Sequence, residues 1–402
     1  MNKYKRIIAN FTVIFCFITF TSCSEEKMTY RKGDIGMLKE KCINKLAKTS
    51  KRIKDTIPYT TKDGVYNDFS TENRIGWWTN SFWTGILWQL YEETGDSTYK
   101  KYAESTESKL QKALYALNTP AHDIGFWYLL SGVRNYELTG NEKSRSDSLL
   151  AADILMSRFN INMSAIRAWE GEGKEGIVII DSMMNVPLLY WASKEIGDNR
   201  FALIADIHAN TVKKHFVRED GSVCHILRFD TTTGEMVEEC DGQGYAPGSS
   251  WTRGQGWAIY GFAQCYEWTK NADYLETAKK VSDYFISEAE KNDYKIKSDF
   301  RQPEDNMLYD SSAAAIAACG MIEIYKHCSD EKYLNAAKKL VFACDEHFCP
   351  WDDENDEALL KFASERYVYQ TQISLIYGDY YFFKAVCELD KITGGINNEK
   401  KN

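Results

Sequence analysis

Two aspartates in this 402-residue chain stand where a carboxyl group could carry out acid–base chemistry. Asp181 follows the apolar residues 177–180, and Asp123 precedes Ile124 at the start of another apolar stretch. A carboxyl group partly removed from water has a raised pKa, so it can deliver a proton near neutral pH. Each aspartate could instead cap a helix N-terminus, and the local sequence of Asp181 slightly favours the cap.

The two carboxyl groups would influence each other's pKa if the fold brought them face to face. Each would then disfavour ionisation of the other, and they would titrate as a pair. Paired carboxylates suggest ordinary glycoside hydrolysis, but sequence order does not supply their separation, so retaining and inverting chemistry both stay open.

Aromatic residues cluster beside three expected helix starts. The clusters are residues 77–83 (WWTNSFW), 123–128 (DIGFWY) and 251–257 (WTRGQGW). Flat aromatic faces next to hydrogen-bonding side chains suit sugar rings, whereas core packing is the simpler explanation for any single tryptophan. Three such clusters at corresponding helix starts favour a saccharide cleft.

A repeated pattern of helix ends predicts the elements that position these residues. Five similar segments begin at residues 91, 136, 193, 266 and 325, often with a Gly that ends one helix and an Asp or Asn that starts the next. Such spacing is typical of helix-pair repeats. It predicts an all-α fold of about twelve helices closed into an (α/α)6 barrel. An open solenoid is the alternative, but irregular insertions favour the closed ring.

The longest insertion, residues 215–250, breaks the helical rhythm. Residues 222–229 alternate in polarity as a strand does, and residues 230–235 resemble a turn. Residues 236–240 would form a second strand that runs back beside the first, so we predict a small β-hairpin. Long loops on a rigid scaffold are where binding groups collect.

The N-terminus has the features of an export signal. A basic start precedes the apolar residues 7–20, which are too few to span a membrane comfortably, and small residues precede Cys23. This pattern is similar to a bacterial lipobox and predicts lipidation of Cys23 and a lipoprotein in the periplasm or outer membrane. An ordinary cleaved signal is the alternative.

The amino-acid composition limits the classes of function that the mature chain can have. Hydrophobic residues make up 44%, enough for a large core, and the net charge of −9 becomes −12 once the basic leader is removed. An acidic protein without basic clusters is a poor candidate for nucleic-acid binding, and an anionic substrate would need a local positive pocket. The expected organisation is a signal peptide over 1–22, a tether over 23–33, a catalytic domain over 34–390 and a polar tail over 391–402.

The cysteines and histidines do not form a recognisable framework. Eleven cysteines include no C-x-x-C pair, and nine remain after Cys16 and Cys23 are set aside. We predict mostly buried free thiols; a bridge between Cys224 and Cys240 is conceivable but not expected. The six histidines lack metal-ligand spacing, so no zinc site is expected.

Several segments together resemble glycoside hydrolase family 88, the unsaturated glucuronyl hydrolases. The similarity extends over about residues 37–389, and the family fold is an (α/α)6 barrel. The matching segments are 122–126 (HDIGF), 180–185 (IDSMMN), 241–245 (DGQGY), 249–262 (SSWTRGQGWAIYGF) and 310–315 (DSSAAA).

This resemblance implies a glycosidase that acts on lyase-generated oligosaccharides ending in a 4,5-unsaturated uronic acid, with glycosaminoglycan as the expected source. The enzyme would hydrate the double bond: Asp181 would protonate C4 and take a proton from the water that adds at C5. The hemiketal would then open and the glycosidic bond would be lost. No covalent intermediate, cofactor or metal is implied, and a polysaccharide lyase would act upstream.

The resemblance also implies roles for other residues. Asp123 would hold ring hydroxyls and assist proton transfer. Arg253 would supply positive charge for the uronate, or would brace Asp181 or Asp241. The implied substrate-binding positions are Trp77, Trp169, His225, Gln243, Arg253 and Trp257.

Three alternatives stay open at this stage. An unsaturated rhamnogalacturonyl hydrolase acting on pectic oligosaccharides has the same barrel and related chemistry. An epimerase of the N-acylglucosamine type would need a catalytic histidine pair that we cannot place. A non-catalytic glycan-binding lipoprotein would keep the tryptophans and make Asp181 dispensable.

Overall fold

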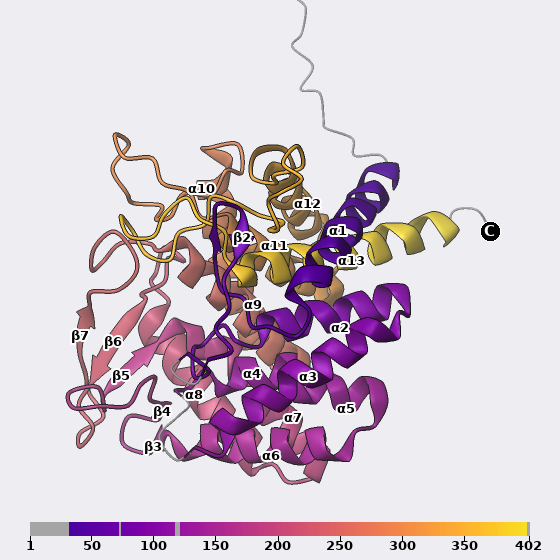
Figure 1. The fold of residues 1–402 in the computed structure, drawn as a ribbon. Coiled ribbons are helices and arrows are strands. Elements are labelled where there is room, and N and C mark those ends of the chain that lie inside the picture. Colours follow the sequence, from indigo (N-terminus) through magenta and orange to yellow (C-terminus); the bar gives the residue numbers. More distant parts are fainter. Residues whose placement is uncertain (1–31, 72–73, 117–120, 400–402) are drawn as a thin grey trace, which may run out of the picture.

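A computed structural model describes residues 32–71, 74–116 and 121–399. The described chain is mostly helical, and its helices form an inner and an outer set (Figure 1). The inner set is α2 (Phe82–Thr94), α4 (Ile124–Leu130), α5 (Gly132–Thr139), α7 (Pro187–Ile196), α9 (Thr252–Thr269), α11 (Ser311–Cys328) and α13 (Ile376–Glu399). The outer set is α1 (Lys32–Ile53), α3 (Ser97–Leu114), α6 (Glu142–Ser157), α8 (Arg200–Phe216), α10 (Ala272–Glu290) and α12 (Glu331–His347).

The inner helices close into a ring. Each contacts the next in the order α2, α4, α7, α9, α11, α13, and α13 returns to α2. Only Ser131 separates α4 from α5, so the two act as one bent inner helix and the described chain has twelve helices arranged as six pairs. The predicted (α/α)6 barrel is confirmed, and the open solenoid is wrong.

The repeated segments end helices as predicted. Gly95, Gly140 and Gly197 follow α2, α5 and α7 in the left-handed conformation, with φ of 71°, 73° and 68°. A glycine adopts this conformation without the steric cost of a Cβ. Asp96 then caps α3 by accepting a 2.8 Å hydrogen bond from the Thr98 amide.

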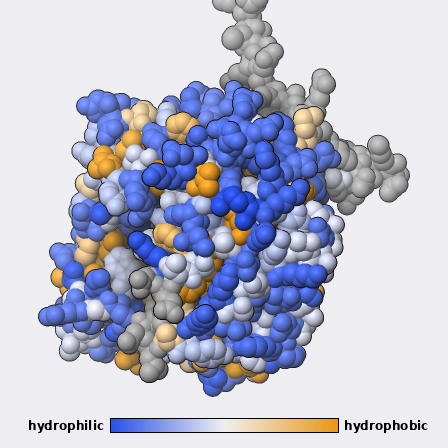
Figure 2. Space-filling model, viewed as in Figure 1, coloured by the Kyte–Doolittle hydropathy of each residue, from blue (hydrophilic) through white to orange (hydrophobic). Residues whose placement is uncertain are grey.

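The inner and outer helices differ in how much of their surface is buried. On α9 every residue from Thr252 to Ala263 is buried, whereas the outer helices bury one stripe and expose the other. A helix that is covered on all sides belongs to the core, and a striped one lies at the surface. On the face in Figure 2 the hydrophobic residues form small areas separated by hydrophilic ones.

The β-hairpin is confirmed and is part of a larger sheet. Strands β6 (Ile226–Phe229) and β7 (Met236–Cys240) pair antiparallel, and β5 (Ile177–Ile179) adds a third strand beside β6. The third strand was not predicted. It leads directly into the segment that carries Asp181. Two minor sheets pair β1 (Thr61–Lys62) with β2 (Val65–Tyr66) and β3 (Phe159–Asn160) with β4 (Ala165–Ile166).

The first and last described helices meet at one side of the ring, where α1 packs against α13 (Figure 1). Helix α1 begins at Lys32, and α13 continues to Glu399, past the expected end of the domain at residue 390. The signal peptide and Cys23 lie outside the described residues. Among the described helices, none is both long and apolar enough to cross a membrane. All nine cysteines in the described ranges are free, including Cys224 and Cys240.

Candidate active site

The sequence-predicted site residues gather where inner helices begin. Asp123 precedes α4, Asp181 lies in a short 3-10 helix (η1, Ile180–Met184) before α7, and Arg253 lies in the first turn of α9. His225 immediately precedes β6. The aromatic clusters at α2, α4 and α9 therefore stand at corresponding helix ends, as predicted.

Asp181 does not cap a helix. It sits inside η1, is 8% exposed, and its Oδ1 atom has no hydrogen-bond partner among the residues that the structure describes. His225 Nε2 lies 3.5 Å from that oxygen. The Gln243 amide donates a 3.0 Å hydrogen bond to His225 Nδ1, so neutral His225 carries its proton on Nε2, facing Asp181.

A chain of hydrogen bonds holds the turn that presents Asp181. The Ile166 amide donates to His208 Nδ1 at 3.0 Å, so Nε2 of this histidine carries the proton and donates to Ser182 Oγ at 2.7 Å. Ser182 Oγ in turn donates to the Ile179 carbonyl at 2.7 Å. His208 is fully buried, so a side chain of the outer helix α8 fixes the backbone beside Asp181.

The raised pKa expected for Asp181 is found on Asp123 instead. Burial and the charge of Asp181 raise the pKa of Asp123 to about 7. Burial alone would also raise the pKa of Asp181, but His225, His122 and Arg253 outweigh it and lower this pKa. The two carboxyl groups are coupled, as predicted, and with a pKa of about 7 Asp123 holds a shared proton in preference to Asp181.

Unpartnered polar atoms concentrate around these aspartates. His122 is fully buried, lies 3.5 Å from Asp123 Oδ1, and has no hydrogen bond to the described part of the chain at either ring nitrogen. Buried polar groups are nearly always hydrogen-bonded, so such a concentration marks the place of a polar ligand or ordered water. Other unpartnered atoms on the candidate site residues and their neighbours are Asp181 Oδ1, His225 Nε2 and the indole nitrogens of Trp77, Trp251 and Trp257.

The three predicted tryptophans occupy different surroundings. Trp77 is half-buried and packs edge-on against Tyr59, with ring centroids 5.6 Å apart. Trp169 is half-buried against a small apolar cluster formed by the three-stranded sheet. Trp257 is 0% exposed and packs at 5.5 Å against Phe126, so its observed contacts are those of a core residue. Stacking on a sugar stays a prediction for all three.

Arg253 forms a buried ion pair that the sequence did not predict. Its guanidinium donates to Asp310 Oδ2 at 2.6 Å and to the carbonyls of Ser364 and Glu365 at 2.5 and 2.6 Å. Gln243 Nε2 donates to the same Glu365 carbonyl at 2.6 Å. Both side chains therefore hold the loop around residue 365 beside the site, and direct contact of Arg253 with a uronate stays a prediction.

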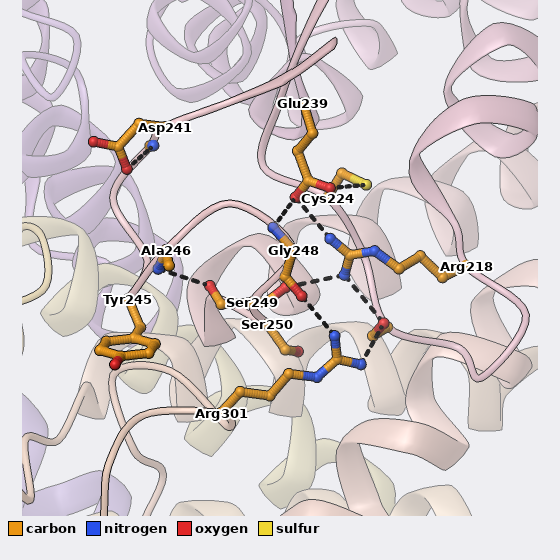
Figure 3. A network of polar contacts seen from close by, with 12 residues as sticks. Arg218, Cys224, Glu239, Asp241, Tyr245, Ala246, Gly248, Ser249, Ser250 and Arg301 are labelled. Atoms are coloured by element: carbon orange, nitrogen blue, oxygen red, sulfur yellow. Dashed lines mark hydrogen bonds and ion pairs between the residues drawn. The ribbon is translucent and has the colours of Figure 1, made fainter.

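The loop that carries Gln243 is anchored at its far end by two arginines (Figure 3). Arg218 donates to the Ser249 carbonyl at 3.0 Å and to Glu239 Oε1 at 2.7 Å. Arg301 donates to the Gly248 carbonyl at 2.7 Å. The loop is thereby fixed to the end of β7, which favours a preformed site.

Two residues that shape the site were not singled out as site positions from the sequence. Asn185 accepts a hydrogen bond from the Phe126 amide at 2.8 Å and so ties α4 to the segment carrying Asp181. Trp251 stacks on His225 with ring centroids 4.0 Å apart. Both residues stand inside or beside the quoted motifs, and that position was the only signal available.

Comparison with known proteins places the chain in a family. Residues 49–265 match Glycosyl Hydrolase Family 88. An unsaturated glucuronyl hydrolase of Bacillus sp. strain GL1 is 36% identical over 363 residues, which cover 87% of this chain and 95% of that protein. The chain belongs to glycoside hydrolase family 88. An unsaturated chondroitin disaccharide hydrolase of Streptococcus pyogenes is 35% identical over 69% of this chain and 70% of its own length.

Solved structures of this family share the fold. The crystal structure of the unsaturated glucuronyl hydrolase from Bacillus sp. GL1, responsible for the degradation of glycosaminoglycan, superposes with a TM-score of 0.81 at 34% identity. The matched region covers 88% of this chain and 96% of the Bacillus chain. A variant of the Streptococcus agalactiae enzyme complexed with dGlcA-GalNAc6S has a TM-score of 0.76 at 27% identity, over 90% of this chain and 94% of its own.

Proposed function

We propose that this family 88 glycosidase removes the 4,5-unsaturated uronic acid from the non-reducing end of oligosaccharides released by a polysaccharide lyase, with glycosaminoglycan fragments as the preferred source. The observation that carries the proposal is the coupled pair Asp123 and Asp181, set among unpartnered polar atoms at the ring mouth. Relatives that act on unsaturated glucuronyl or chondroitin disaccharides support the substrate class.

The pair supplies one proton to the double bond. With its pKa of about 7, Asp123 is partly protonated at neutral pH and holds that proton in preference to Asp181. A bound uronate adds negative charge near Asp181 and raises its affinity for a proton, so the Asp123 proton passes to Asp181. Asp181 then protonates C4, and the positive charge that develops at C5 is shared with the ring oxygen. Water adds at C5 and returns a proton to Asp181, after which the hemiketal opens and the aglycone leaves.

His225 and Gln243 position the water and the carboxylate. His225 presents its Nε2 proton toward Asp181 because its Nδ1 is occupied by the Gln243 amide. This contact stabilises Asp181 as an anion, which is the form that receives the proton from water. The half-buried Trp77 and Trp169 have ring surface left to stack on a sugar.

Asp181→Asn tests the assignment. Unsaturated uronates absorb ultraviolet light through the conjugated double bond, so turnover removes the absorbance. We expect wild type to remove it and Asp181→Asn to lose about 10²–10⁴-fold in kcat while it still binds the disaccharide. A wild-type protein that binds unsaturated disaccharides without altering them would identify a glycan-binding protein and overturn the proposal.

The substrate source is tested in the same assay. Unsaturated glycosaminoglycan and pectic disaccharides are compared side by side, with sulfated and unsulfated forms of the former. Higher kcat/KM on the glycosaminoglycan set is expected. A preference for pectic disaccharides would identify an unsaturated rhamnogalacturonyl hydrolase instead.

We also propose that the protein is exported and anchored through a lipid on Cys23. The support is the basic and apolar leader that ends in small residues before this cysteine. Cys23→Ala is expected to move the protein from the membrane fraction to the soluble fraction and to remove a lipid label. A wild-type protein without the label would contradict the proposal.

A further inference from the structure

A second cluster of chemically competent side chains lies at the opposite end of the ring. His327 and Glu323 stand one turn apart near the end of α11, and Glu267 lies in the last turn of α9. Helix α9 begins at the active-site mouth, and Glu267 is fifteen residues after Thr252, about 22 Å along the axis at 1.5 Å per residue. This cluster is therefore separate from the catalytic aspartates.

The geometry of His327 is not that of a hydrogen-bonded histidine. Its Nε2 atom lies 3.3 Å from Glu267 Oε2 and 3.3 Å from Glu323 Oε1, yet it makes no hydrogen bond to either. A single N–H can point at only one of two oxygens. A metal ion placed between the three atoms would bind all of them at once.

The spacing suits a small tetrahedral ion. With metal–ligand bonds of about 2.0–2.1 Å, neighbouring ligands of a tetrahedral zinc site are about 3.3 Å apart. Both distances from His327 have this value, and all three ligand atoms lie within 4.8 Å of one another. Glu323 and His327 are at i and i+4, so they present their ligand atoms on one face of α11.

The electrostatic surroundings also favour a cation. Both helices end within a few residues of the cluster, and the C-terminal end of a helix carries partial negative charge. Lys270 contacts Glu267 Oε2 at 2.5 Å, but its side chain is 59% exposed and can turn away into solvent. Lys326 contacts Glu323 at the other oxygen, Oε2, and leaves Oε1 to the cluster. The Tyr266 ring, 4.9 Å from the imidazole, restrains His327.

We propose that Glu267, Glu323 and His327 bind one divalent transition-metal ion of the zinc class, which clamps the ends of α9 and α11 together. Two carboxylates and a neutral imidazole balance a charge of +2, and water completes the coordination. The sequence did not suggest this site because it needs only one histidine and takes a ligand from α9, which neighbours α11 in space but lies more than fifty residues earlier in the sequence.

Zinc titration of tag-free, chelator-treated full-length protein tests the proposal. Calorimetry is expected to give one Zn²⁺ per chain, and thermal unfolding should shift upward with added Zn²⁺. Loss of even a second-shell partner weakens metal binding by about 10–100-fold, so His327→Gln and Glu323→Gln should each weaken it at least tenfold. His347→Gln is the matched control, because His347 stands near the end of α12 beside one carboxylate, Glu346, at 3.9 Å.

Cobalt provides a second readout that does not depend on stability. Co²⁺ in a tetrahedral nitrogen and oxygen site absorbs visible light, and this absorption should appear in wild type and His347→Gln only. Circular dichroism verifies that each variant is folded. If wild type binds no Zn²⁺ at millimolar concentration, or if both ligand variants bind it as wild type does, the cluster is an ordinary ion triad around a protonated His327 and the proposal is wrong.

Discussion

The unusual pKa of Asp123 makes protein stability depend on pH in a way that one substitution should remove. Its pKa rises from 3.8 to about 7 in the folded protein because of burial and the charge of Asp181. The folded state therefore holds the proton more tightly than the unfolded chain. This stabilisation is complete below pH 4 and is lost as the pH rises through 7.

The size of the effect follows from the pKa difference. At about 1.4 kcal/mol for each pH unit, a rise from 3.8 to about 7 corresponds to about 4 kcal/mol. Asp123→Asn keeps the shape of the side chain and cannot ionise. Relative to wild type, this variant should gain up to about 4 kcal/mol in free energy of unfolding between pH 4 and pH 8.

Urea denaturation followed by tryptophan fluorescence, repeated from pH 4 to pH 8, measures this difference. Asp379 is a second buried carboxyl group whose pKa is raised to about 7 by burial, but it is present in both proteins, so its contribution cancels in the difference. Asp181→Asn removes part of the cause and should give a smaller pH dependence than wild type. Parallel pH curves for wild type and Asp123→Asn would refute the assigned protonation of the pair.

Two further substitutions, one with a control, test how the site is held. Arg253→Met breaks a fully buried ion pair and should lower the free energy of unfolding by about 3–5 kcal/mol. The control Arg200→Met removes an exposed pair with Asp198 and should change it by less than about 1 kcal/mol, so equal losses in urea denaturation would argue against the buried clamp. Gly125→Ala places a Cβ 2.5 Å from the Asn185 Cα, which forces α4 away from the turn that carries Asp181. It should destabilise the protein by about 1–3 kcal/mol and lower kcat; unchanged kcat would show that this close approach does not position the catalytic pair.

The helical architecture could be predicted from the sequence because residues close together in the chain mark where its helices end and begin. In five of the six pairs the inner helix ends at a glycine or a polar residue in the left-handed conformation, and the outer helix begins after an Asp or Asn, as at Gly95 and Asp96. The hairpin of β6 and β7 could also be predicted, because its two strands are close together in the sequence. Strand β5 was not predicted because its partner β6 is some fifty residues away in the sequence, and short apolar runs do not reveal distant pairing.

The protonation states of Asp123 and Asp181 could not be predicted from the sequence. An apolar run before Asp181 suggests burial and a raised pKa, but the pKa depends equally on the charges that the fold brings near. His225 and Arg253 come from other elements and reverse the direction for Asp181. The burial of Arg253 against Asp310 depends likewise on the fold, which brings together the starts of the neighbouring inner helices α9 and α11.

The order of two events in one reaction tests the hydration chemistry most directly. An unsaturated disaccharide is followed simultaneously for loss of the double-bond absorbance and for release of the reducing-end sugar, beside a matched disaccharide whose uronic acid is saturated. If Asp181 protonates C4, absorbance is lost before or together with sugar release, and the saturated disaccharide is inert. Release of the sugar before the absorbance falls, or cleavage of the saturated disaccharide, would show attack at the anomeric carbon and contradict the proposed mechanism.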